Sequence, residues 1–243
     1  MNEQESVRVN FGKPFPVFPL QHPVLLPHGV VSLFVFEHRY RQMVSEVLDG
    51  AGQIALAVYD GDGFVHDYEG TPPIMPAVCV GQIVHHQQNA DGTYNILLQG
   101  VCRAEIQQEE GPEGERLYRV AALKPIDAPG LEAYEDSCSA YLRQELSSML
   151  SSGPIGALEP VQRLREQLER QDEELDADVF FDLMALCLFS MLEGDDLRYQ
   201  LLAESDATRR AQFIHRELKN LNDTLETAER QFDPDAPKGV SWN

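Results

Sequence analysis

The chain lacks long apolar runs and closely spaced cysteines, and both absences disfavour a membrane or secreted protein. No stretch of its 243 residues approaches the run of about eighteen apolar residues expected of a membrane helix. The N-terminal residues lack the charged start and apolar core of a secretion signal. The four cysteines lie far apart and form no CxxC pair. We therefore expect a cytoplasmic protein with reduced thiols and no membrane span.

Positive charge is also scarce. The chain has 19 Lys and Arg residues against 40 Asp and Glu residues, which gives a net charge of −21. The parts before and after residue 129 are both acidic, so the charge is not confined to a tail. Nucleic-acid binding normally relies on Lys and Arg to displace the counterions of phosphates. The composition therefore disfavours DNA and RNA as partners.

Motifs for catalysis and metal binding are missing as well. The sequence contains no GxSxG or HExxH signature. Its sole Gly-Lys dipeptide, Gly12-Lys13, is followed by Pro14, so it has no phosphate-binding GxxxxGK[ST] loop. His85 and His86 are adjacent and would point to opposite faces of a strand, and no His or Cys spacing suits a metal. We predict no catalytic residue, no metal site and no cofactor, and thus a protein that is not an enzyme.

The first part of the chain, to about Pro129, has the patterns of β-strands. Two long runs flank Asn89-Ala90-Asp91-Gly92, a strong hairpin signal. In the second run apolar and polar residues alternate, which predicts one buried and one solvated face, with Arg103 on the solvated one. The run 29–36 is apolar and β-branched enough for a well-buried strand, and two prolines favour an edge or a bend for the run 15–20. The expected strands span residues 15–20, 29–36, 53–59, 77–86, 94–109 and 117–125, with one helix between residues 37 and 48.

The second part of the chain has helical periodicity. Helices are expected at residues 131–150, 158–171, 177–192, 195–203 and 207–232. Apolar residues in the last one alternate by four and three, the seam of a coiled coil. That seam could pack on neighbouring helices of the same chain or join two copies in a homodimer, and both alternatives stay open. The pattern predicts a β domain at 1–129, an α-helical lobe at 130–232 and a flexible tail at 233–243.

Three segments in this order carry a resemblance to a known family. Residues 16–57, PVFPLQHPVLLPHGVVSLFVFEHRYRQMVSEVLDGAGQIALA, resemble the opening of the N-terminal, substrate-binding domain of Lon protease. Residues 80–106, VGQIVHHQQNADGTYNILLQGVCRAEI, resemble a hairpin of that domain, and residues 201–221, LLAESDATRRAQFIHRELKNL, resemble its helical extension. The likeness spans about residues 14 to 230.

The resemblance implies an α+β fold. It implies a PUA-like β pseudobarrel of about six strands with one helix, followed by an α-helical bundle with a long last helix. It also implies a role in recognising polypeptides, without the ATPase and Ser–Lys peptidase domains that follow in full Lon proteases. We therefore expect a non-catalytic module whose partners are unfolded or client polypeptides or a separate protease.

Four residues are candidates for contact with a partner. Glu37, Arg39 and Tyr40 lie where an expected strand turns into a helix, and Arg103 lies on the expected solvated strand face. Capping of the helix start by Glu37 is the competing structural explanation for the first three. Two other functions remain as alternatives: an RNA-binding PUA-like protein, which the charge disfavours, and a regulatory scaffold that self-associates through the last helix.

Overall fold

The computed structural model describes residues 7–61, 70–126, 137–170, 175–192 and 194–231. The chain forms two compact units. One contains residues 1–134 and 192–210, and the other contains residues 135–191 and 211–243. The expected tail at 233–243 and the start of the helix expected at 131–150 lie outside the described residues. The expected mixture of a β part and an α part is confirmed.

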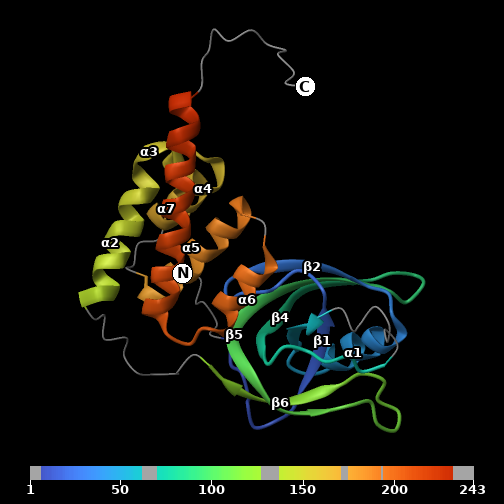
Figure 1. The fold of residues 1–243 in the computed structure, drawn as a ribbon. Helices are drawn as coiled ribbons and strands as arrows, with labels where there is room; N and C mark the ends of the chain where they lie inside the picture. The colour runs from blue at the N-terminus through green and yellow to red at the C-terminus, as the bar shows by residue number, and fades with distance from the viewer. Residues whose placement is uncertain (1–6, 62–69, 127–136, 171–174, 193, 232–243) are drawn as a thin grey trace, which may run out of the picture. The chain divides into compact units, whose positions relative to one another are not determined.

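The first unit is built on a six-stranded sheet that closes on itself (Figure 1). The strand order is β2-β5-β4-β3-β1-β6, and an additional pairing of β5 with β6 closes the circuit. Long alternating segments and the turn signals between them fold into the expected strands. These strands are β1 (Phe15–Leu20), β2 (Val30–Val35), β3 (Gln53–Val58), β4 (Ala77–Gln88), β5 (Tyr94–Glu110) and β6 (Val120–Pro125).

The hairpin of β4 and β5 forms where the sequence predicts it. At its tip Gly92 has a φ of 79°, a left-handed conformation that glycine adopts without a steric penalty. Asp91 accepts hydrogen bonds from the backbone N–H of Thr93 at 3.0 Å and from its hydroxyl at 2.7 Å. These bonds lower the pKa of the exposed Asp91 carboxyl. The tip is thus held by local bonds that the Asn-Ala-Asp-Gly sequence supplies.

Strand β1 lies between β3 and β6 and not at an edge, which is one of the two positions that its prolines favour. Its first residues pair with β6, through Phe15 and Pro16, and the residues from Val17 to Leu20 pair with β3. The N–H of Val17 donates to the carbonyl of Arg119 at 3.0 Å, so the nitrogen of the neighbouring Pro16 points away from β6, before the β3 ladder begins. Because the strand changes partner along its length, its two prolines remove few hydrogen bonds between strands.

The strand β2 differs from the well-buried strand that its composition suggests. It alternates instead, with Leu33 and Val35 buried and Val30, Ser32 and Phe34 exposed. Its residues pair only with the first half of β5, from Val30 opposite Gln99 to Val35 opposite Tyr94. One face of β2 packs into the core and the other faces solvent, because the period of a strand is two residues whatever the side chains are.

The core of the first unit lies inside the closed sheet. Small and β-branched side chains dominate it, since facing strands of a narrow barrel leave little interior volume. The buried cluster consists of Phe15, Val17, Ala55, Ala57, Val78, Val80, Ala104, Ala121 and Leu123. Helix α1 (His38–Leu48) buries Tyr40, Met43 and Val44 on the same unit, and Asp49 is its C-cap residue.

A second helix, α6 (Asp195–Ala203), packs on β4 in the same unit. It buries Leu201 and Leu202, each 1% exposed. This helix covers Arg103, which the alternation of β5 placed on a solvated face. That expectation is wrong, because Arg103 is 1% exposed and its Nε donates to the carbonyl of Leu201 at 3.2 Å. A distant helix thus decides the burial of a residue that its own strand leaves outward.

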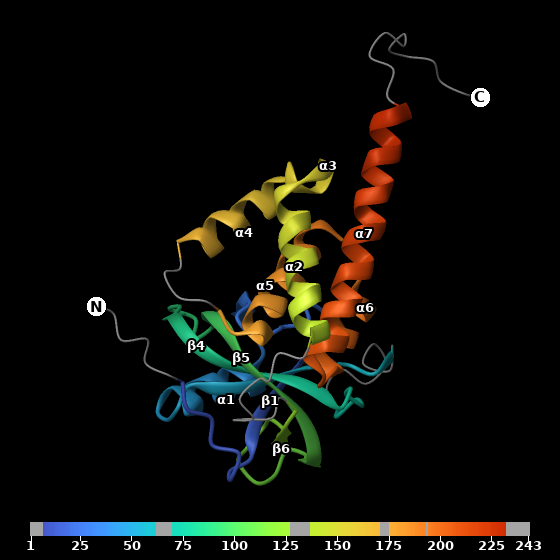
Figure 2. The same cartoon turned by 90° about the vertical axis from the view of Figure 1, so that its left-hand side faces the viewer.

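The second unit is helical (Figure 2). Its central helix, α5 (Ala177–Met191), contacts α2 and α4 and is apolar on nearly every side, as expected of a helix with neighbours all round. The expected helix bounds that fall on described residues agree with the structure to within a few residues, and a short helix α3 follows the turn after α2. The other elements are α2 (Ser137–Ser151), α3 (Gly153–Gly156), α4 (Glu159–Glu169) and, continuing from the first unit, α7 (Ala207–Gln231).

The apolar seam of α7 divides into two parts. Ala211, Ile214 and Leu218 are at most 2% exposed, so this part is covered within the chain. Leu221 and Leu225 are half-buried. The amide of Asn222 also lies against α3, where its Oδ1 accepts a hydrogen bond from the N–H of Ile155 at 3.4 Å. Pairing of two copies through this helix stays a prediction, and only the second part of the seam is open to it.

The close approach of Gly100 on β5 to a loop provides a test of the fold. A Cβ atom at Gly100 would lie 2.1 Å from the backbone oxygen of Leu26. Gly100→Ala should therefore lower the free energy of unfolding by about 3 kcal/mol, measured by urea denaturation, because neither backbone moves without breaking pairing.

The matched control is Gly111→Ala, where the nearest atom to the new Cβ, on Thr71, lies at 4.0 Å. This change should alter the free energy of unfolding by less than about 0.5 kcal/mol. Equal stability of both variants would contradict the close packing of Gly100 against Leu26.

Candidate functional site

Three of the four candidate residues meet at the junction of β2 and α1. The Arg39 guanidinium pairs with the Glu37 carboxylate, with both Nε and Nη2 at 2.9 Å from Oε2. Its Nη1 donates to the carbonyl of Gly70 at 3.3 Å, which ties the helix start to a distant loop. Glu37 is the N-cap residue of α1, but its side chain makes no capping hydrogen bond. The Glu37 carboxylate binds the Arg39 guanidinium, so helix capping does not explain the glutamate at this position.

Tyr40 is an internal support of the same junction. It is 3% exposed, and its ring lies 4.4 Å from that of Phe18 on β1, centroid to centroid. The Arg39 guanidinium lies over the Tyr40 ring, 4.8 Å from its centroid. Burial is the main cause that raises the pKa of Tyr40 far above its ordinary value, so the ring stays neutral. Such a residue positions α1 on the sheet and offers little surface to a partner.

Arg103 lies at a different place in the unit, between β5 and α6. With its guanidinium bound to the Leu201 carbonyl, it fastens α6 to the sheet. A second hydrogen bond joins α6 to the sheet, because the Tyr199 hydroxyl accepts from the N–H of Ala77 at 2.8 Å. Burial is the largest cause that raises the pKa of Tyr199 above its ordinary value. The four candidates therefore do not form one site.

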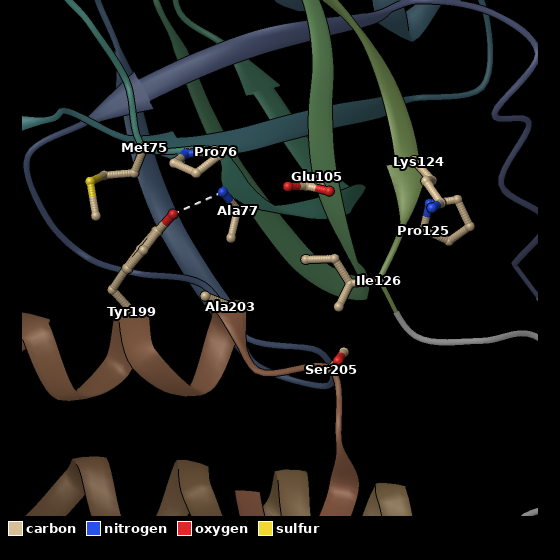
Figure 3. Close-up of a pocket in the computed structure, with 10 residues that line it drawn as sticks. All are labelled: Met75, Pro76, Ala77, Glu105, Lys124, Pro125, Ile126, Tyr199, Ala203 and Ser205. Carbon is tan, nitrogen blue, oxygen red and sulfur yellow. Dashed lines mark hydrogen bonds between the residues drawn. The ribbon is translucent and has the colours of Figure 1, made fainter. Parts of the chain in front are cut away.

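A pocket of about 470 Å³ lies beside the hydrogen bonds that Arg103 and Tyr199 make between α6 and the sheet (Figure 3). Apolar atoms of Met75, Pro76 and Ile126 line it, together with the ring of Tyr199. Glu105 and Lys124 face each other across the β5–β6 ladder on its wall, and both are exposed. The sequence offers no signal for this pocket, because α6 is far from the strands along the chain.

The polar groups of the pocket are few. Its lining in the described part of the chain has two hydroxyls, on Tyr199 and Ser205, and no histidine or cysteine that could activate them. The Tyr199 hydroxyl already accepts the Ala77 N–H. Elsewhere among the described residues, no group of three or more His, Cys, Asp or Glu side chains is placed to hold a metal ion. No described helix is both long and apolar enough to cross a bilayer.

Exposed apolar side chains lie on β2 and on Phe36, the residue that follows it. Val30, Phe34 and Phe36 are 58%, 56% and 57% exposed. The rings of Phe34 and Phe36 lie nearly parallel, with centroids 6.0 Å apart. Sequence reasoning assigned these residues to the core because the whole run is apolar. The one available signal was Ser32, a polar residue in the same phase of the strand as Val30 and Phe34.

Comparison with known proteins gives a family match over most of the chain. The family model for the ATP-dependent protease La (LON) substrate-binding domain matches residues 14–220. The Lon protease of Azorhizobium caulinodans is 32% identical over 116 residues, which are 48% of this chain and 13% of that protein. The Lon protease of Escherichia coli K12 is 28% identical over 106 residues, 44% of this chain and 13% of that protein. The chain thus spans a small part of these relatives.

A solved structure agrees with this chain at the level of the fold. The N-terminal domain of a Mycobacterium avium complex Lon protease superposes with a TM-score of 0.61 at 16% identity, over 86% of this chain and 99% of that one. A Lon N-terminal domain protein from Xanthomonas campestris has a TM-score of 0.48 at 19% identity, over 91% of this chain and 99% of that one.

The buried position of Arg103 predicts a structural role for this candidate. Arg103→Leu fills the position with an apolar side chain but leaves the Leu201 carbonyl without this donor. The free energy of unfolding, measured by urea denaturation, should therefore fall by about 2 kcal/mol. Glu105→Gln, two positions along β5 and exposed, is the control and should be neutral. Unchanged stability of Arg103→Leu would show that the guanidinium is not needed to hold α6.

Proposed function

The chain belongs to the family of the Lon protease substrate-binding domain, and we propose that it is a polypeptide-recognition module with no catalytic activity of its own. The family match over residues 14–220 supports a substrate-recognition role. The proposal extends this role to unfolded or client polypeptides, held by non-covalent contacts in the cytoplasm. A separate protease that receives the bound polypeptide is part of the same proposal.

The observation that carries the proposal is the exposed apolar face of β2. Large apolar side chains that remain more than half exposed, such as Phe34 on β2 and Phe36 just after it, are typical of surfaces that bind another molecule. An unfolded polypeptide differs from a folded one by exposing apolar side chains and free backbone amides. A surface that offers apolar contacts therefore favours the unfolded form over the folded form.

Two properties of the chain support the absence of catalysis within this proposal. The sequence has no GxxxxGK[ST] loop for a nucleotide, since Pro14 follows Gly12-Lys13. Among the described residues, no hydrogen bond joins the pocket hydroxyls of Tyr199 and Ser205 to Glu105 or Lys124, the two groups there that could act as a base. RNA binding remains the alternative that the charge of −21 disfavours, because phosphates would meet a surface of the same sign.

The proposal is tested by fluorescence anisotropy of the labelled protein. We expect saturable binding to a reduced and alkylated, permanently unfolded protein, and no binding to the same protein in its native, disulfide-bonded form. Transfer RNA is the counter-ligand and should not bind at physiological salt. A complex with the RNA that weakens steeply as salt rises would instead support the RNA-binding alternative. No binding of the unfolded protein would overturn the proposal and leave the self-associating scaffold.

A further inference from the structure

Strand β2 is the one described strand with a single partner. The other five form the closed circuit β5-β4-β3-β1-β6, in which each strand has a neighbour on both sides. β2 lies outside this circuit and pairs only with residues 94–99 of β5. One edge of β2 therefore carries backbone groups that no described strand pairs with.

The register shows which groups face this edge. The N–H of Gly100 donates to the carbonyl of Gly29 at 2.8 Å, so the carbonyl of Gly29 faces β5. In an antiparallel pair the groups that face the partner alternate along the strand. The N–H and C=O groups of Val30, Ser32 and Phe34 accordingly point to the free edge. Three donors and three acceptors are thus available at the spacing of a strand.

The free edge lacks the features that usually block strand addition. Natural edge strands are protected by proline, lysine, inward-pointing charge, bulges or short length. β2 reads VVSLFV over six residues, with no proline, no charge and an uninterrupted register against β5. The side chains on its outer face, Val30, Ser32 and Phe34, are all exposed. The edge is therefore open in both its backbone and its side chains.

The described face beside the edge, on β2 and the first half of β5, carries no Asp, Glu, Lys or Arg and mixes apolar with polar side chains. Next to β2, the outward residues of β5 are Asn95, Leu97 and Gln99, which are the register partners of Phe34, Ser32 and Val30. Exposed Val84, at the bulge of β4, extends the apolar area behind Leu97. In a chain with a charged fraction of 24%, a strand face without any charge suits an apolar partner.

We infer that the free edge of β2 binds an extended apolar segment of a client polypeptide as an added antiparallel or parallel strand. This inference rests on the proposed function and names the site and binding mode. Backbone hydrogen bonds to Val30, Ser32 and Phe34 give affinity for any extended segment. Contacts with Phe34 and Phe36 select segments with apolar side chains at alternate positions. Folded proteins are rejected because their strands are already paired.

Charge identifies the kind of segment. The net charge of −21 attracts polypeptides that carry Lys and Arg beside the apolar stretch, and it repels acidic ones. The same charge repels a second copy of this chain, which would bring an equal negative charge to the edge. The occupant is therefore an apolar segment with basic flanks from a different polypeptide.

The test uses the full chain and a labelled peptide with six alternating β-branched and aromatic residues between pairs of lysines. Ser32→Pro removes one edge donor and places a ring at the edge, without removing a hydrogen bond to β5. We expect it to weaken peptide binding at least tenfold, measured by anisotropy. Ser32→Thr keeps the N–H and should bind as the natural chain does. The double change Phe34→Ser and Phe36→Ser keeps the backbone and should weaken binding about tenfold.

Controls separate this inference from the proposed function. Tyr141→Ser removes an exposed aromatic side chain from α2 in the other unit and should leave binding unchanged. Glutamates in place of the peptide's lysines should weaken binding, with the difference shrinking at high salt. Thermal unfolding checks that each variant is folded, and the phenylalanine double variant decides the test if Ser32→Pro is not.

Each outcome has a definite meaning. If the natural chain binds the peptide and the β2 variants bind equally well, the inference is overturned while polypeptide recognition stands. If the natural chain binds neither the peptide nor an unfolded protein, both fail. If sedimentation shows a dimer that Ser32→Pro abolishes, a second copy occupies the edge and the inference is wrong.

Discussion

The triple pairing of strand β5 is the constraint on which the strand-rich unit depends. Its 17 residues pair with β4 along one edge and, in succession, with β2 and β6 along the other. A strand that makes three ladders must bend, and the register shifts against β4 and β6 provide the bends. Gly100 lies between the ladders to β2 and β6, where the backbone of Leu26 approaches too closely for any side chain. The closure of the sheet and the path of the loop before β2 both follow from this point.

The same pairing leaves β2 with a free edge. Because β6 takes the second half of β5 and closes the circuit with β1, only the first half of β5 remains for β2. β2 then has no neighbour on its other side among the described strands. The closed circuit supplies the rigidity, since its core is buried on all sides. The strand outside it can bind another segment without any change in that core, so recognition and stability rest on different strands.

The sequence predicted much of the fold because its signals are local. Alternation and the Asn-Ala-Asp-Gly turn predict β4 and β5, and periodicity predicts the helices to within a few residues. What it missed depends on contacts between distant segments. The burial of Arg103 requires α6, almost a hundred residues away, and the exposure of Phe34 and Phe36 follows from the outlying position of β2. Residue type alone predicts that an arginine is exposed and that a phenylalanine is buried. In this chain Arg103 is buried, and Phe34 and Phe36 are exposed. Glu37, Arg39 and Tyr40 lie at the strand-to-helix junction that the sequence predicts, where Glu37 pairs with Arg39 instead of capping the helix, and their contact with a partner stays a prediction.

An unprotected edge strand is normally a hazard, because copies of the same protein can join through it. This chain carries no proline or lysine on β2 to prevent that, so the protection must come from elsewhere. The net charge of −21 can prevent joining of two copies, because their surfaces carry charge of the same sign and repel each other. A charge on β2 itself would block clients as well as copies. Distributed negative charge discriminates between them, because it opposes copies of the chain and attracts basic segments. The acidity that disfavours RNA therefore also allows the apolar edge of β2 to stay open.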